Sequence, residues 1–162
     1  MPEPDSDNWQ LLLARHRAAL FLMARQYLTT REEAEDAVHD GFVKFWKSRT
    51  SARDPLAYLF TCVRNAALDL RRARNSGVHA SACPPLSLLE PSVEQEERRD
   101  QIETALAQIP SEQREVLVLK IWSELTFAQV AEVLKIPPNT AASRYRYALQ
   151  NLEPLLAKEF KS

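Results

Sequence analysis

Apolar residues recur along this chain at helical spacing, in two blocks separated by a stretch without that pattern. Within each block they fall three or four residues apart, which is typical of helices with one buried side. The helices predicted in this way cover residues 8–28, 30–48, 55–74, 98–108, 111–122, 127–135 and 138–152. The pattern therefore predicts an all-α protein.

The stretch between the blocks has the composition of a linker. It contains three prolines and the acidic run EQEE, and it lacks apolar periodicity. We therefore expect two small helical domains. A three-helix bundle covers residues 1–77, an acidic linker covers 78–97, and a second helical bundle covers 98–162.

The last two helices predict a helix-turn-helix. Only Ile136 and Pro137 separate them, so the helices must cross steeply. Thr126 is suited to cap the first of the two, and Ser111 to cap the helix before them. Pro138 has the backbone angle of a first helical turn.

The final helix has two chemically different sides when turned at about 100° per residue. The inner side carries Ala141, Tyr145, Ala148, Leu149 and Leu152. The outer side carries Asn139, Thr140, Ser143, Arg144, Arg146, Tyr147 and Gln150. Hydroxyl, amide and guanidinium groups of this kind bind phosphates and base edges in a DNA major groove. The alternative is an ordinary solvated face of a helical bundle.

The outer side of the second helix combines charge with an aliphatic residue. It carries Asp36, His39, Asp40, Val43 and Lys47. An isolated exposed valine is common, so this position alone indicates little. Gly41 in the same helix is unexpected, because glycine inside a helix costs about 1 kcal/mol relative to alanine.

The third helix has the residue types of a single-strand binding surface. It begins after Asp54, which can cap it, and it ends in the basic cluster LRRARN. Its polar and aromatic candidates are Tyr58, Phe60, Arg64, Asn65, Arg71, Arg72 and Arg74. Aromatic rings stack on bases and arginines neutralise phosphates. Cations at the end of a helix also complement its dipole, which is a structural reason for one or two of them.

The net charge bears on DNA binding only when the segments of the chain are considered separately. Hydrophobic residues make up 45% of the sequence, as in a globular protein, and the net charge is -1. Residues 1–77 carry a net +2, residues 78–97 a net -4 and residues 98–162 a net +1. The candidate DNA-binding parts are therefore mildly basic. Affinity for DNA should be weak and salt-sensitive without a partner.

The remaining composition argues against an enzyme. No phosphate-binding glycine loop, catalytic pair or complete metal site is visible, so we expect no cofactor. His79 and Cys83 make at most half a metal site, and Cys62 and Cys83 should be reduced thiols. There is no signal peptide or membrane-length apolar run, which predicts a cytoplasmic protein.

Three segments, in order along nearly the whole chain, give it a family resemblance. They are EEAEDAVHDGFVKFW, AYLFTCVRNAALDLRR and IPSEQREVLVLKIWSELTFAQVAEVLKIPPNTAASRYRYAL. With these segments the chain resembles the extracytoplasmic-function sigma factors, the small initiation subunits of bacterial RNA polymerase. The resemblance implies partners: core RNA polymerase, promoter DNA and an anti-sigma factor.

The resemblance also implies roles for residues already singled out. Asp36, His39, Asp40 and Val43 match the stretch that docks on polymerase. Asn65 matches a position that faces the minus-ten element, with Tyr58, Phe60, Arg64, Arg71 and Arg72 around it. The loop 49–54 matches the one that captures a flipped base. Thr140, Ser143, Arg144 and Arg146, with Tyr147 on the same side, match the helix that enters the minus-thirty-five groove.

The chain departs from the family in its last helix. Ala142 stands where many members have lysine, and Tyr147 and Leu149 stand where they have further arginines. One alternative is therefore a sigma-like mimic that sequesters an anti-sigma factor without binding DNA. A free-standing helix-turn-helix repressor would leave the first 77 residues unexplained.

Overall fold

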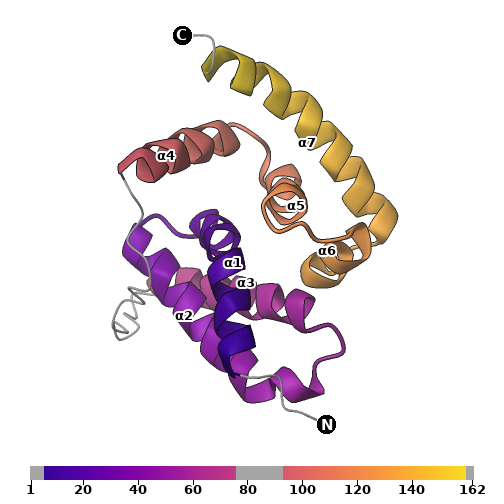
Figure 1. Ribbon diagram of the computed structural model, residues 1–162. Coiled ribbons are helices and arrows are strands. Elements are labelled where there is room, and N and C mark those ends of the chain that lie inside the picture. The colour runs from indigo at the N-terminus through magenta and orange to yellow at the C-terminus, as the bar shows by residue number, and fades with distance from the viewer. Residues whose placement is uncertain (1–5, 76–92, 160–162) are drawn as a thin grey trace.

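The computed structural model describes residues 6–75 and 93–159, and within these ranges the chain is helical and has no strand (Figure 1). The α-helices are α1 (Ser6–Arg25), α2 (Arg31–Ser48), α3 (Pro55–Asn75), α4 (Val93–Ala107), α5 (Ser111–Ile121), α6 (Phe127–Leu134) and α7 (Pro138–Glu159). A short 3-10 turn, η1 (Arg49–Ser51), follows α2. The all-α prediction is confirmed. None of the described helices is long and apolar enough to cross a membrane.

Several predicted details differ from the structure. α7 continues to Glu159 and passes through Pro154, and Leu149 is 38% exposed instead of buried. α5 begins at Ser111 itself, after Pro110, and no side chain caps it. α1 ends at Arg25, before the predicted end at residue 28. Most of the predicted linker, residues 78–92, lies outside the described residues, and residues 93–97 form the start of α4.

The first three helices pack around large apolar side chains. Phe45 of α2, Phe60 of α3 and Leu20 of α1 have no exposed surface. The predicted cap of α3 is present, since the Ala57 amide donates to Asp54 Oδ1 at 3.2 Å. Thr30 caps α2, because its Oγ1 accepts from the Glu33 amide at 3.2 Å. These caps satisfy amides that α2 and α3 leave unpaired at their first turns.

Gly41 lies where α2 touches the backbone of α3. A Cβ atom built on Gly41 would lie 2.5 Å from the Cα of Val63 and 2.7 Å from its backbone nitrogen. No side chain can move aside to relieve a contact with backbone atoms. The missing side chain is therefore what allows the two helices to pack this closely, and this explains a residue that helix propensity alone disfavours.

The helix-turn-helix forms as the sequence predicts. Thr126 and Gln129 make a reciprocal capping box at the start of α6. α6 ends at Leu134, Lys135 after it has a left-handed backbone with φ of 58°, and α7 starts at Pro138. Phe127 and Tyr145 pack edge to face with ring centroids 5.5 Å apart, which fixes α6 against α7.

The two groups of helices, α1–α3 and α4–α7, lie in contact with each other. α5 packs against α1, and α6 packs against α3 (Figure 1). The buried apolar residues of both groups belong to one connected cluster. The arrangement of α7 relative to α3 is therefore set by packing between the groups.

Acid is expected to destabilise the fold through His16. Its ring is buried in α1 and packs edge to face on Phe60, with centroids 5.9 Å apart. Burial, and then the charge of Arg15, lower the pKa of His16 below its usual value of 6.5. The unfolded chain therefore takes up a proton near pH 6.5 before the folded protein does. The free energy of unfolding should fall as the pH drops below 6.5 and should level off below the folded pKa.

Urea denaturation between about pH 5 and pH 8 measures this effect. The variant His16→Gln is the control, because it lacks the titrating ring. The fall should be smaller in the variant than in the wild type, and equal falls in both proteins would show that His16 is not its cause.

Candidate nucleic-acid interface

The outer side of α7 offers a polar surface to solvent. Asn139, Arg146, Tyr147 and Gln150 are exposed, whereas Thr140, Ser143 and Arg144 are half-buried. The Arg146 guanidinium lies 5.4 Å from the centroid of the Tyr147 ring. Arg144 pairs with Glu112 of α5 at 3.6 Å, and the Glu112 carboxylate remains mostly exposed. Both arginines are therefore near the surface, and the ion pair with Glu112 can be exchanged for another anion at little cost.

The polar face of α3 divides into exposed and buried members. Asn65, Arg71 and Arg72 are exposed. Tyr58 is half-buried and packs against Phe45 with centroids 6.0 Å apart. Phe60 has no exposed surface, so in this structure its ring packs in the core and offers no face to DNA. The prediction placed Phe60 on the wrong side of α3, because an aromatic residue near a basic run suits both a core and a stacking surface.

The Arg64 side chain is largely buried and contacts Tyr27 and the second group of helices. Its Nε donates to Tyr27 Oη at 3.1 Å, and its Nη2 lies 3.4 Å from Glu115 Oε1 on α5. The Tyr27 hydroxyl donates to the same carboxylate oxygen. Arg64 and Glu115 side chains are only 19% and 15% exposed. Burial, and then the Glu115 charge, raise the pKa of Tyr27, so its hydroxyl stays protonated.

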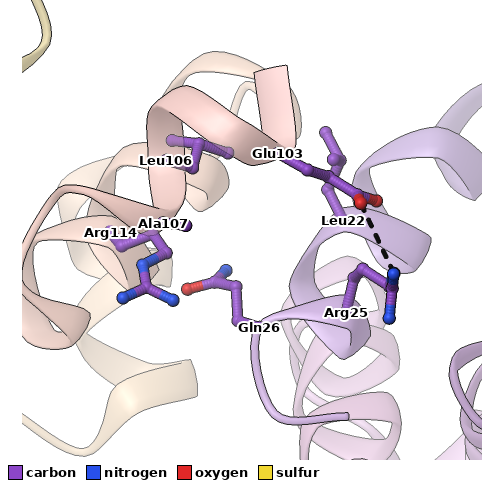
Figure 2. Close-up of a pocket in the computed structure, with 7 residues that line it drawn as sticks. All are labelled: Leu22, Arg25, Gln26, Glu103, Leu106, Ala107 and Arg114. Carbon is purple, nitrogen blue, oxygen red and sulfur yellow. Dashed lines mark ion pairs between the residues drawn. The ribbon is translucent and has the colours of Figure 1, made fainter. Parts of the chain in front are cut away.

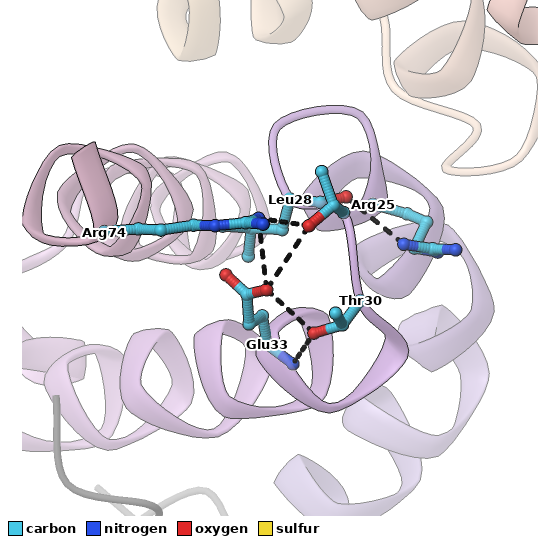
Figure 3. A network of polar contacts seen from close by, with 6 residues as sticks. Arg25, Leu28, Thr30, Glu33 and Arg74 are labelled. Atoms are coloured by element: carbon cyan, nitrogen blue, oxygen red, sulfur yellow. Dashed lines mark hydrogen bonds and ion pairs between the residues drawn. The ribbon is translucent and has the colours of Figure 1, made fainter. Parts of the chain in front are cut away.

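Arg74, at the end of the same basic cluster, holds two helices together. It donates to Thr29 and lies 3.3 Å from Glu33 Oε1, and Glu33 in turn accepts from the Thr30 hydroxyl at 2.8 Å (Figure 3). Arg74 therefore ties the end of α3 to the start of α2. Arg72 pairs with Asp69 one turn away at 2.9 Å, and both side chains are exposed.

The loop between α2 and α3 is short and well anchored. Arg49 stacks over Trp46, 3.7 Å from the ring centroid, and donates to the Trp46 carbonyl. At the other end of the loop, Asp54 caps α3 with one carboxylate oxygen and accepts from Gln129 Nε2 of α6 with the other, at 3.1 Å. The helix-turn-helix therefore touches this loop directly.

The outward side of α2 carries two neighbouring carboxylates, those of Asp36 and Asp40. Val43 is 37% exposed, as its position in the pattern predicts, and Asp36, His39 and Asp40 are half-buried. Burial, and then the charge of Asp40 four residues away, raise the pKa of Asp36. His39 Nδ1 is buried without a hydrogen-bond partner. A positively charged partner would stabilise the two carboxylates of this surface.

The described residues offer no metal centre and no reactive thiol. Across residues 6–75 and 93–159, no three His, Cys, Asp or Glu side chains gather closely enough to hold a metal ion. Cys62 is buried, and this burial raises the pKa of its thiol, which disfavours the reactive thiolate. His79 and Cys83 lie outside the described residues.

Three residues that make these contacts could not be identified as contact residues from the sequence. Tyr27, Glu115 and Gln129 each look like ordinary members of a helix or turn. Each makes its contact with a residue that is 37 or more positions away. Folding of the first group brings Tyr27 to Arg64, and packing of the two groups brings Glu115 and Gln129 to the predicted nucleic-acid face.

Two family models match this chain in the order of its two groups of helices. The model described as Sigma-70 region 2 matches residues 12–77, and the model described as Sigma-70, region 4 matches residues 99–152. Together they account for most of the chain. The first match covers α2, α3 and most of α1, and the second contains the helix-turn-helix.

Relatives of similar length carry the same family name. The ECF RNA polymerase sigma factor SigL of Mycobacterium tuberculosis is 31% identical over 150 residues, which cover 87% of this chain and 84% of SigL. SigM of the same species is 32% identical over 154 residues, covering 90% of this chain and 75% of SigM. SigK of Mycobacterium sp. (strain KMS) is 27% identical over 165 residues, covering 95% and 86%.

Two solved structures share the fold. The sigma factor RpoE from Bartonella quintana, in complex with the anti-sigma factor NepR, matches with a TM-score of 0.65 and 26% identity, covering 96% of this chain and 99% of that one. CnrH, in complex with the cytosolic domain of CnrY, matches with a TM-score of 0.65 and 24% identity, covering 96% and 91%. The chain belongs to the extracytoplasmic-function sigma factors, which act in transcription initiation by bacterial RNA polymerase.

Proposed function

We propose that this sigma factor binds core RNA polymerase in the cytoplasm, directs it to a two-part promoter and helps to open the DNA, with no catalysis of its own. α7 reads the upstream element, α3 and the loop before it hold the melted minus-ten strand, and the outer side of α2 docks on the polymerase. The relatives support this function by their family name.

The observation that carries the proposal is the exposed polar side of α7. Asn139, Arg146, Tyr147 and Gln150 face solvent while Ala141 and Ala148 are fully buried. A helix that follows a tight turn and presents a guanidinium, amides and a phenol outward can enter a major groove. The two buried alanines hold α7 close to its neighbours, so the polar side is rigidly displayed.

Reconstituted transcription tests the function. Core polymerase supplemented with this protein should give discrete transcripts from a library of fragments from the source genome, and core polymerase alone should not. If the protein binds core polymerase and no fragment yields a specific transcript, the proposed function is wrong. Without polymerase, the protein should bind the same fragments only weakly and mainly at low salt.

The double variant Asp36→Asn, Asp40→Asn should bind core polymerase more weakly. Burial, and then repulsion from Asp40, raise the pKa of Asp36, and a basic surface on the polymerase would stabilise both carboxylates. We expect a loss of about a hundredfold or more in affinity, because two charge-assisted contacts are removed and each is worth about 1.5–3 kcal/mol at an interface. Competition against labelled wild-type protein for core polymerase measures it.

The control for this variant is Asp69→Asn, which removes a carboxylate from an exposed position of α3. Its affinity for core polymerase should match that of the wild type. An unchanged affinity in the Asp36 and Asp40 variant would remove these residues from the docking surface.

An anti-sigma partner is part of the proposal. RpoE, which shares the fold over 96% of this chain, is held in its solved structure by the anti-sigma factor NepR. A protein of that class would have to cover the exposed sides of α2, α3 or α7 to prevent initiation. Copurification of the protein from its own cells, followed by identification of the bound polypeptide, tests this part.

A further inference from the structure

A pocket of about 200 Å³ lies between the end of α1 and helices α4 and α5 (Figure 2). None of the residues that line it belongs to the surfaces proposed for DNA or for polymerase. An engineered cavity of about 150 Å³ is large enough to bind benzene. This pocket therefore has room for a molecule of the size of one amino acid.

Two polar side chains in the pocket have hydrogen-bonding capacity that the protein does not use. Figure 2 shows Gln26 and Arg114 directed toward each other. Both amide atoms of Gln26, Oε1 and Nε2, are buried without a partner, which costs free energy unless something else bonds to them. A ligand in the pocket would therefore find one free donor and one free acceptor on Gln26.

Arg114 supplies a positive charge that no carboxylate of the described residues neutralises. Its Nε and Nη2 donate to the Ile109 carbonyl at 3.3 Å and 3.0 Å, and it forms no ion pair within residues 6–75 and 93–159. The other arginine of the pocket, Arg25, is already paired with Glu103 at 3.4 Å, to one side in Figure 2. The charge left over in the pocket is therefore positive, and it favours an anion.

The rest of the pocket is apolar. Leu22 of α1 and Leu106 of α4 are buried, and Ala107 lies beside them in the lining. Such side chains gain from contact with an aliphatic group and offer nothing to a fully polar ion. The pocket therefore combines a positive charge, an amide and an apolar wall within the space of one small molecule.

We propose that this pocket binds a small organic acid that carries a hydrogen-bond donor beside its carboxylate and a short apolar chain. The carboxylate accepts from Gln26 Nε2 and neutralises Arg114, and the neighbouring donor binds Gln26 Oε1. The apolar chain lies against Leu22 and Leu106. Both α-hydroxy acids and α-amino acids have this chemistry. The inference adds small-molecule binding to the protein and does not depend on the proposed function.

Isothermal titration calorimetry of the full chain tests the site with matched probes. Leucate and L-leucine carry the carboxylate, the donor and a branched apolar chain, whereas isocaproate lacks the donor and leucinamide lacks the carboxylate. We expect leucate to bind with a dissociation constant of about 1 mM or tighter, because L-leucine adds a positive charge near Arg114. Isocaproate and leucinamide should bind at least about tenfold more weakly, since each leaves a buried polar group unpaired.

Two variants locate the binding in this pocket. Gln26→Leu removes both amide atoms, and Arg114→Gln removes the charge while keeping a donor for the Ile109 carbonyl. Each should weaken binding of leucate at least about tenfold. Without ligand, Gln26→Leu should be at least as stable to urea as the wild type, because it removes two unpaired buried polar atoms. A loss of binding in this variant is then not a loss of folding.

Gln101→Leu and Arg98→Gln are the matched controls. They make the same replacements at exposed positions of α4. Neither residue lines the pocket, so both controls should bind leucate as the wild type does.

Binding that both pocket variants lose and both controls keep supports the site. Tighter binding of leucate assigns the site to α-hydroxy acids, and tighter binding of L-leucine assigns it to α-amino acids. If neither acid binds at about 10 mM, or if Gln26→Leu and Arg114→Gln bind as well as the wild type, the pocket holds only water and the proposal is wrong. Isocaproate that binds as tightly as leucate would also overturn it.

Discussion

Gly41→Ala is expected to destabilise the protein by about 2 kcal/mol, although alanine is the better helix former by about 1 kcal/mol. The added methyl group would lie 2.5 Å from the Cα of Val63, well inside contact distance. α2 and α3 would have to move apart, and the packing around Phe45 and Phe60 would loosen. Chemical denaturation followed by circular dichroism measures the loss.

Two further variants make this result specific. Lys47→Ala, at an exposed position of the same helix, should change stability by less than about 0.5 kcal/mol. Gly41→Ala should cost less when it is added to Val63→Ala than when it is added to the wild type, because the contact with Val63 Cγ2 is gone and those with the backbone remain. A Gly41→Ala protein as stable as the wild type would mean that the helices are not packed this closely.

Replacing both Arg144 and Arg146 by alanine should weaken binding of the polymerase complex to its promoter by about a hundredfold. Each arginine contact with a base or a phosphate is worth about 1–3 kcal/mol. α7 has few other cations, since Ala142, Tyr147 and Leu149 occupy positions where charge could stand. Loss of the ion pair between Arg144 and the mostly exposed Glu112 carboxylate should cost little stability. Footprinting of the upstream element across a salt series measures the effect.

Replacing Arg144 and Arg146 by lysine distinguishes the contribution of side-chain charge from that of side-chain shape. It keeps the attraction to phosphate and loses the planar fork that arginine offers to a base edge. The lysine variant should therefore keep most of the salt dependence and lose discrimination between promoters. Arg98→Ala, an exposed arginine on α4, is the control for a lost charge. If the double alanine variant protects the upstream element as well as the wild type does, α7 does not read it.

The local features of the fold could be predicted because neighbouring residues determine them. The caps at Thr30, Asp54 and Thr126, and the turn before Pro138, follow from side chains within three positions of the helix start. Leu149 and Phe60 were misplaced because periodicity gives a side of a helix and not the neighbour that covers it. The extension of α7 through Pro154 depends on packing that a proline signal opposes.

The inter-group contacts could not be predicted from local pattern. Glu115 is 51 positions from Arg64, and Gln129 is 75 positions from Asp54. An acidic residue within an amphipathic helix has the same local signature whether it faces solvent or another domain. Gly41 stood out in the sequence only as a costly residue in a helix, and the pattern did not indicate the close approach to Val63 that explains it.

The Arg64 side chain contacts one carboxylate, that of Glu115, and one phenol hydroxyl, that of Tyr27. Neither residue belongs to α7, the helix proposed to read the upstream element. If α7 reads the upstream element as proposed, a substitution at residue 27 or 115 would alter the contacts of Arg64 without altering the side chains of α7 that would select the promoter.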